Sequence, residues 1–104
     1  MPELCAITES IKIMGTKPRL LIVRNLDGNA SRNRNELGFN ELKKLCELSS
    51  RTLALNLGFL VKKKIVQARK EKNRRFYSLT GRGEELLPVL IDIGKWGKKW
   101  NIYP

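Results

Sequence analysis

The chain has 104 residues and a net charge of +11, and its 41% of hydrophobic residues is enough to build one domain with a modest core. It contains two cysteines but no histidine, and it has no glycine-rich phosphate loop and no carboxylate pair in an apolar setting. We therefore expect that the protein is not an enzyme and has neither a cofactor nor a metal site. No apolar run approaches the roughly 20 residues that span a bilayer and no signal peptide is recognisable, so we expect a cytoplasmic protein without a membrane partner.

The first forty residues predict two helices and a loop. Apolar residues recur at helical spacing over residues 8–14, and Gly15 follows them as a stop signal. Residues 18–26 begin with proline, which suits a first helical turn, and are apolar nearly all round, so we expect a buried second helix. Residues 29–36 are polar without a period, which is typical of a loop.

Residues 41–62 have the pattern of a helix-turn-helix. Asn40 is predicted to cap a short helix over residues 41–46, whose inward-facing residues are Leu42, Leu45 and Cys46. Two hydroxyl residues, Ser49 and Ser50, then open a second helix. Its leucines at i, i+4 and i+7 form one apolar face: Leu53, Leu57 and Leu60.

The opposite face of this second helix carries the candidate DNA-reading residues. Arg51 and Asn56 have donor-rich side chains of the kind that contact base edges in the major groove. The full predicted set is Ser49, Ser50, Arg51, Thr52, Leu55 and Asn56.

A basic hairpin is predicted next, over residues 65–79, with a polar turn over residues 70–73. Its cations are candidate phosphate contacts: Arg69, Lys70, Lys72, Arg74 and Arg75. Residues 41–80 hold eleven Lys or Arg and three Asp or Glu, so +8 of the net +11 lies in this central segment. Charge concentrated on one supersecondary unit indicates a polyanionic partner, here double-stranded DNA, although a solvated basic surface is the alternative.

A long final helix is predicted over residues 81–100, capped by Thr80 and bent by Pro88. Its apolar band is broader than one small domain can cover, and two tryptophans end it. We therefore predict a subunit interface, with the intradomain core as the alternative. The candidate interface residues are Leu86, Leu90, Ile93, Trp96 and Trp100.

These elements together predict a mainly α protein with a small β-hairpin wing, an α+β fold class. The architecture is a winged helix-turn-helix that occupies residues 1–104 as a single domain. We expect it to dimerise through its terminal helices.

Several short motifs follow one another along the chain: Cys5-Ala6-Ile7-Thr8, Gly15, Phe39-Asn40-Glu41-Leu42, Ser49 to Leu57, Tyr77-Ser78-Leu79-Thr80 with Gly83, Leu86-Leu87-Pro88-Val89-Leu90, Trp96-Gly97 and Trp100. In this order they resemble the HxlR-type family, winged-helix transcriptional regulators allied to the MarR group. The resemblance implies a homodimer that binds near-palindromic operators. The chain departs from the family pattern at Ala6, Pro18, Asn56 and Lys64, the last standing where glycine usually ends the recognition helix.

The resemblance also places Cys5 where some family members sense oxidants or electrophiles. Because Cys5 is predicted to lie just before a helix, the amides of that N-terminus would favour its thiolate. A small packed residue is the alternative reading of Cys5. The sequence does not indicate whether a small-molecule effector binds the protein.

The sequence therefore predicts a sequence-specific, double-stranded DNA-binding transcriptional regulator that acts as a homodimer and responds, through Cys5, to oxidants or electrophiles. Two alternatives use the same features: a non-specific architectural DNA-binding protein, and a winged helix that serves as a protein-interaction module.

Overall fold

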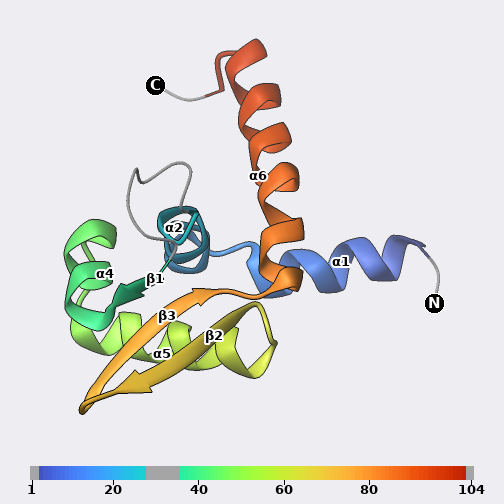
Figure 1. Ribbon diagram of the computed structural model, residues 1–104. Coiled ribbons are helices and arrows are strands. Elements are labelled where there is room, and N and C mark those ends of the chain that lie inside the picture. The colour runs from blue at the N-terminus through green and yellow to red at the C-terminus, as the bar shows by residue number, and fades with distance from the viewer. Residues whose placement is uncertain (1–2, 28–35, 103–104) are drawn as a thin grey trace.

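The computed structural model describes residues 3–27 and 36–102. In chain order the elements are α1 (Glu3–Met14), α2 (Lys17–Asn25), β1 (Glu36–Gly38), α4 (Phe39–Cys46), α5 (Ser50–Lys62), β2 (Val66–Glu71), β3 (Arg74–Leu79) and α6 (Gly81–Lys99). The predicted α+β class is confirmed. Figure 1 shows α2, α4 and α5 gathered with the sheet in one body, from which α1 and α6 project in different directions. Apart from Glu36, which begins β1, the loop predicted over residues 29–36 lies outside the described residues.

The sheet is antiparallel, with β3 between β1 and β2. The hairpin turn is shorter than predicted, because Lys70 and Glu71 are still paired in β2. Only Lys72 and Asn73 connect the strands, with φ angles of 47° and 66°. Positive φ at both central residues is the geometry of a type I′ turn, whose twist matches that of the flanking strands.

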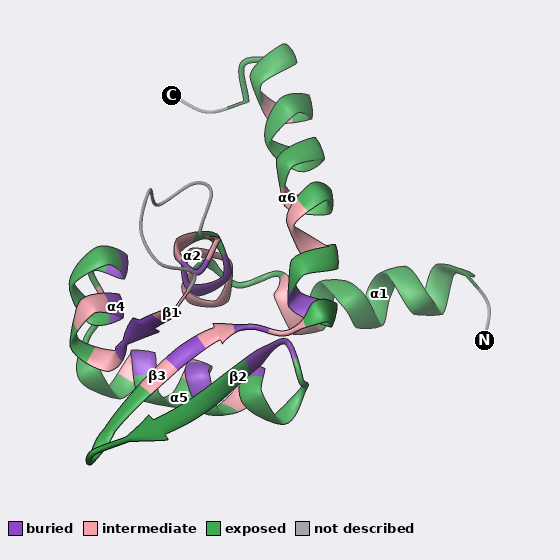
Figure 2. Cartoon of the chain, in the orientation of Figure 1, coloured by how far each residue is buried: buried purple, intermediate pink, exposed green. Residues whose placement is uncertain are grey.

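The core lies between the helices and one face of the sheet. Its buried apolar residues are Ile22, Val23, Leu26, Leu37, Leu42, Cys46, Leu53, Leu57, Leu60, Ile65, Val66, Tyr77 and Leu79. The buried face predicted for α5 is confirmed, and so is the burial of Cys46. Figure 2 shows the burial of α5 confined to one side of the helix.

The prediction for α4 was wrong in two respects. Asn40 lies inside the helix, and Gly38 is the N-cap, whose amide donates to the Glu41 carboxylate at 3.1 Å. Leu45 is 46% exposed rather than buried. Because Leu42 and Cys46 already form the inward i, i+4 pair, Leu45 lies about 100° round the helix from Cys46 and faces outward.

The last turn of α5 keeps its geometry without the glycine that the resemblance implied. Lys64 adopts a φ of 62°, and its amide donates to the Val61 carbonyl at 3.0 Å. The Ile65 amide donates to the Leu60 carbonyl at 2.9 Å. These two bonds close a Schellman motif, which lets the chain turn directly from α5 into the hairpin.

The base of α6 is fixed against the end of α5. The Thr80 hydroxyl caps α6 by accepting from the Gly83 amide at 3.1 Å. Gly83 packs so closely that a Cβ there would lie 2.2 Å from the Ile65 carbonyl oxygen. The helix continues through Pro88 to Lys99. This anchor sets the direction in which α6 leaves the body, and most of α6 beyond it is exposed (Figure 2).

Candidate nucleic-acid interface

The first turn of α5 is fixed by its own hydroxyl groups. The Ser49 hydroxyl oxygen accepts from the Thr52 amide at 3.1 Å and donates to the Thr52 hydroxyl at 3.0 Å. The turn before α5 contains Glu47 in a left-handed conformation, with φ of 54°. A short turn of this kind between two helices places the second helix across the first, the arrangement of a helix-turn-helix.

Three of the predicted DNA-reading residues lie on the open side of α5. Ser50, Arg51 and Leu55 are exposed, and so is Ser49, the N-cap residue that precedes the helix. Thr52 is half-buried, and its amide and hydroxyl both take part in the cap. The residues of α5 that a partner can reach are therefore fewer than the six that were predicted.

Asn56 does not lie on that open face. Its side chain is half-buried, its amide nitrogen donates to the Thr52 carbonyl at 2.8 Å, and its oxygen accepts from Arg19 Nε at 3.2 Å. Both ends of the Asn56 amide are thus engaged within the chain. Through these two hydrogen bonds Asn56 helps to hold α2 against α5, and its amide is not free to contact a base.

Arg19 was not singled out from the sequence, yet it joins three helices. Its Nη1 donates to the Lys12 and Ile13 carbonyls of α1 at 3.0 and 3.1 Å, while its Nε reaches Asn56. Its guanidinium carbon also lies 3.6 Å from the centre of the Phe59 ring. Hydrogen bonds from a cation to carbonyls near a helix C-terminus are favourable, and a guanidinium stacks well on an aromatic face.

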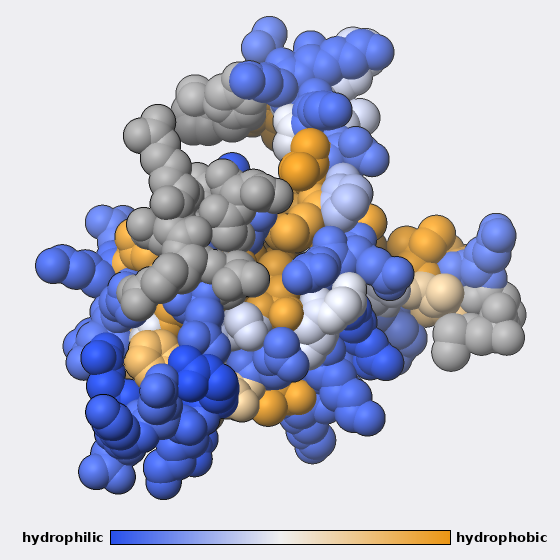
Figure 3. All heavy atoms as spheres, viewed as in Figure 1, coloured by the Kyte–Doolittle hydropathy of each residue, from blue (hydrophilic) through white to orange (hydrophobic). Residues whose placement is uncertain are grey.

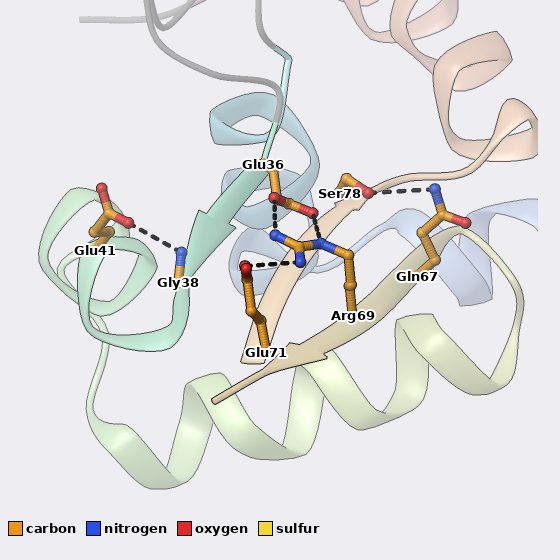
Figure 4. Close-up of polar contacts among 7 residues, drawn as sticks. All are labelled: Glu36, Gly38, Glu41, Gln67, Arg69, Glu71 and Ser78. Atoms are coloured by element: carbon orange, nitrogen blue, oxygen red, sulfur yellow. Dashed lines mark hydrogen bonds and ion pairs between the residues drawn. The ribbon is translucent and has the colours of Figure 1, made fainter. Parts of the chain in front are cut away.

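The hairpin cation Arg69 is likewise committed to the fold. It reaches over β3 to make a two-pronged ion pair with Glu36, at 2.8 and 2.9 Å, and a further contact of 2.9 Å with Glu71 (Figure 4). These carboxylates raise the pKa of Arg69. Arg69 therefore ties the two outer strands together across β3, and its predicted phosphate contact stays a prediction.

The other four cations of the hairpin differ from Arg69. None of the ion pairs among the described residues includes Lys70, Lys72, Arg74 or Arg75, and all four are exposed. Lys70 faces Arg75 directly across the two strands. Figure 3 shows hydrophilic side chains gathered over the hairpin tip. Two like charges in opposite register repel each other, so this pair favours an anionic partner.

The predicted interface residues of α6 fall into two groups. Leu86 and Leu90 are half-buried against the core of their own chain, and Leu90 also lines an apolar groove beside α1. Ile93, Trp96 and Trp100 are 55–61% exposed. With Val89 they recur at intervals of four, three and four residues, and we call this row the α6 stripe.

A second apolar row lies on α1. Leu4, Ile7 and Ile11 recur at helical spacing and are 57–74% exposed. Between the two rows lies an open groove of about 600 Å³ whose walls include Ile11, Leu21 and Ile93. Figure 3 shows apolar side chains over both α6 and α1. Surfaces of this kind are typical of subunit contacts.

The two cysteines lie in different surroundings. Cys5 lies in the first turn of α1, since that helix begins at Glu3 rather than at residue 8, and it is exposed. Cys46 is buried, and its sulfur accepts from the Asn25 amide at 3.5 Å. Burial raises the pKa of the Cys46 thiol, which the Asn25 hydrogen bond partly offsets. We therefore expect Cys46 to be the less reactive of the two thiols.

Comparison with known proteins agrees with this geometry. The model of the HxlR-like helix-turn-helix family matches residues 13–103. HlyU from Vibrio cholerae is 32% identical, with 86% of this chain and 97% of that one covered and a TM-score of 0.66. The oxidised form of the redox regulator HypR is 23% identical over 91% and 96% of the two chains, with a TM-score of 0.77. Diamide-treated YodB from Bacillus subtilis is 22% identical over 88% and 89%, with a TM-score of 0.71.

No curated protein matches the chain. Among the described residues, no helix has both the length and the apolar character needed to cross a membrane. The family model covers the whole of the segment that carries the helix-turn-helix, the hairpin and α6. The chain therefore belongs to the HxlR-like helix-turn-helix family of transcription regulators.

Proposed function

We propose that the protein is a cytoplasmic regulator that binds a specific double-stranded DNA site as a homodimer. The exposed face of α5 reads bases, with Arg51 as its main hydrogen-bonding residue. The hairpin is the wing, and Lys70, Lys72, Arg74 and Arg75 contact phosphates. Ser49, Thr52 and Asn56 hold α5 in position rather than contact DNA bases.

The observation that carries this proposal is the cross-strand pair of Lys70 and Arg75. Like charges directly opposite each other destabilise a free hairpin. A phosphate backbone would relieve that repulsion and release counterions. The same hairpin neutralises Arg69 with two carboxylates. The uncompensated charge is therefore confined to the tip of the wing.

Self-association follows from the two apolar rows. The α6 stripe has the alternating four- and three-residue spacing of a two-helix seam. A second copy that packs against this stripe and the apolar row of α1 would cover both rows at once. Two-fold symmetry would then place the two α5 helices in successive major grooves, about 34–36 Å apart.

A pair of substitutions tests the division of labour between wing and α5. Arg75→Ala should weaken binding to all duplexes alike and lower the slope of log affinity against log salt by about 1 for each half-site. Arg51→Ala should instead relax the preferred sequence, at a cost of about 1–3 kcal/mol on the preferred site. Fluorescence anisotropy over a salt series measures both, with Lys98→Ala on the last turn of α6 as the control. A change of preferred sequence in Arg75→Ala would contradict the assignment.

We further propose that Cys5 makes binding sensitive to oxidants. Cys5 is exposed in the first turn of α1, beside the exposed Leu4 and close to Ile7 of the apolar row on that helix. An adduct or an inter-subunit disulfide there would change how two copies pack, and with it the spacing of their α5 helices. Two proteins of the same fold are described as a redox regulator and as diamide-treated, which supports the proposal.

Mild diamide should lower the DNA affinity of the wild-type protein and leave that of Cys5→Ser unchanged. Cys46 is an internal control, because its thiol is buried and should react slowly. Mass spectrometry reports which cysteine is modified. Unchanged affinity in wild-type protein with Cys5 fully modified would remove the switch and leave Cys5 as a structural residue.

A further inference from the structure

Leu55 is an apolar side chain in the middle of a surface that is otherwise polar or small. It is 66% exposed, whereas the other leucines of α5 are at most 2% exposed: Leu53, Leu57 and Leu60. It follows Arg51 by four residues, so the two side chains lie on the same side of the helix. Leu55 contributes little to the core, and its side chain is available to whatever partner α5 meets.

The neighbours of Leu55 on the open side are small. Ala54 and Gly58 are both exposed, and a Cβ added at Gly58 would have no atom within 4 Å. Short side chains on either side allow the helix backbone to come close to a flat or concave partner. Leu55 and Arg51 are then the side chains that project farthest on this stretch of the open side.

The largest apolar group on the floor of the major groove is the C5-methyl of thymine. A leucine placed against any other base edge would strip water from hydrogen-bonding groups and give them no partner, which costs binding energy. A leucine on a base-reading face therefore favours thymine for two reasons. It gains apolar contact with the methyl group, and at any other base it would leave hydrogen-bonding groups without water or a partner.

We propose that Leu55 is a specificity-determining residue that contacts a thymine methyl in each half-site. The inference rests on the proposed function and adds the chemistry of the operator. Four residues of helix rise about 6 Å, and successive base pairs are about 3.4 Å apart. The thymine should therefore lie within about two base pairs of the base that Arg51 contacts.

The test uses a duplex selected by the full-length protein from a random library, with each thymine of a half-site replaced in turn by deoxyuridine. This replacement removes the methyl group and leaves base pairing intact. One position should lose affinity about four-fold, the ratio that corresponds to burying one methyl-sized group. In Leu55→Ala, affinity for the thymine duplex should fall and the thymine–uridine difference at that position should vanish.

Leu45→Ala is the matched control, because Leu45 is an exposed leucine on the neighbouring helix α4. It should keep the thymine–uridine difference. If no deoxyuridine position matters while the selected duplex is still preferred over random DNA, the Leu55 inference is overturned and the proposed function stands. If the protein does not prefer the selected duplex at all, both fail. If Leu55 instead contacts a partner protein, the selected duplex should still be preferred and no deoxyuridine position should matter.

Discussion

Ile93→Glu should convert the protein into a monomer and lower its affinity for an operator of two half-sites by about 10²–10⁴-fold. Ile93 is 55% exposed in the middle of the α6 stripe and also lines the groove beside α1. A carboxylate there would be buried without a partner if a second copy covers the stripe, which is strongly unfavourable. Two tethered half-site contacts would then become independent, and the avidity would be lost.

Sedimentation at micromolar concentration measures the first effect and anisotropy the second. Lys95→Glu is the control, because it adds negative charge to the same helix about 200° round from Ile93. Circular dichroism should show that Ile93→Glu keeps the helical content of the wild-type chain, since an exposed residue does not hold the core. A wild-type protein that sediments as a monomer would contradict the role of the stripe.

Arg19→Ala should destabilise the protein by about 2 kcal/mol, because it removes a stacked guanidinium and charged hydrogen bonds at once. For a chain of this size the melting temperature should fall by roughly 10 °C. The loss is not spread evenly: α1 loses its link to the body, so its amides should exchange faster with solvent. Because Arg19 also holds Asn56, the orientation of α5 should become less well defined.

The comparison variant for Arg19 is Arg24→Ala on the same helix. The side chain of Arg24 is 58% exposed and makes one ion pair with Asp27 at 3.7 Å, so its removal should change stability by less than about 0.5 kcal/mol. Both variants are melted at one protein concentration, since self-association shifts the melting temperature. Equal decreases in melting temperature in the two variants would show that Arg19 stabilises the protein no more than Arg24 does.

The helix-turn-helix and the hairpin could be predicted because their signals are local. The leucine period of α5, its two hydroxyl residues and the alternation of the hairpin all lie within about thirty residues. Hydrophobic periodicity reports which face of a helix is buried without reference to the rest of the chain. For the same reason the α6 stripe was recognisable, although periodicity alone placed Leu86 and Leu90 in it with Ile93.

The partners of individual polar residues could not be predicted, because they are distant in sequence. Asn56 meets Arg19, 37 positions away, and Arg69 meets Glu36, 33 positions away. Both side chains have the chemistry of DNA contacts, and only the packing of α2 and β1 shows that they are used within the fold. Lys64 is a different case: the Schellman hydrogen bonds hold it at positive φ, which residue type alone does not indicate.

The proposed function requires this chain to recognise a particular DNA sequence rather than DNA in general. The most direct measurement is the ratio of two affinities at one salt concentration, for the duplex selected from a random library and for random duplex of equal length. A sequence-specific regulator should give a ratio of roughly 10³ or more. Equal affinities would contradict it and indicate an architectural protein, and no binding to either duplex at low salt would indicate a protein-interaction module.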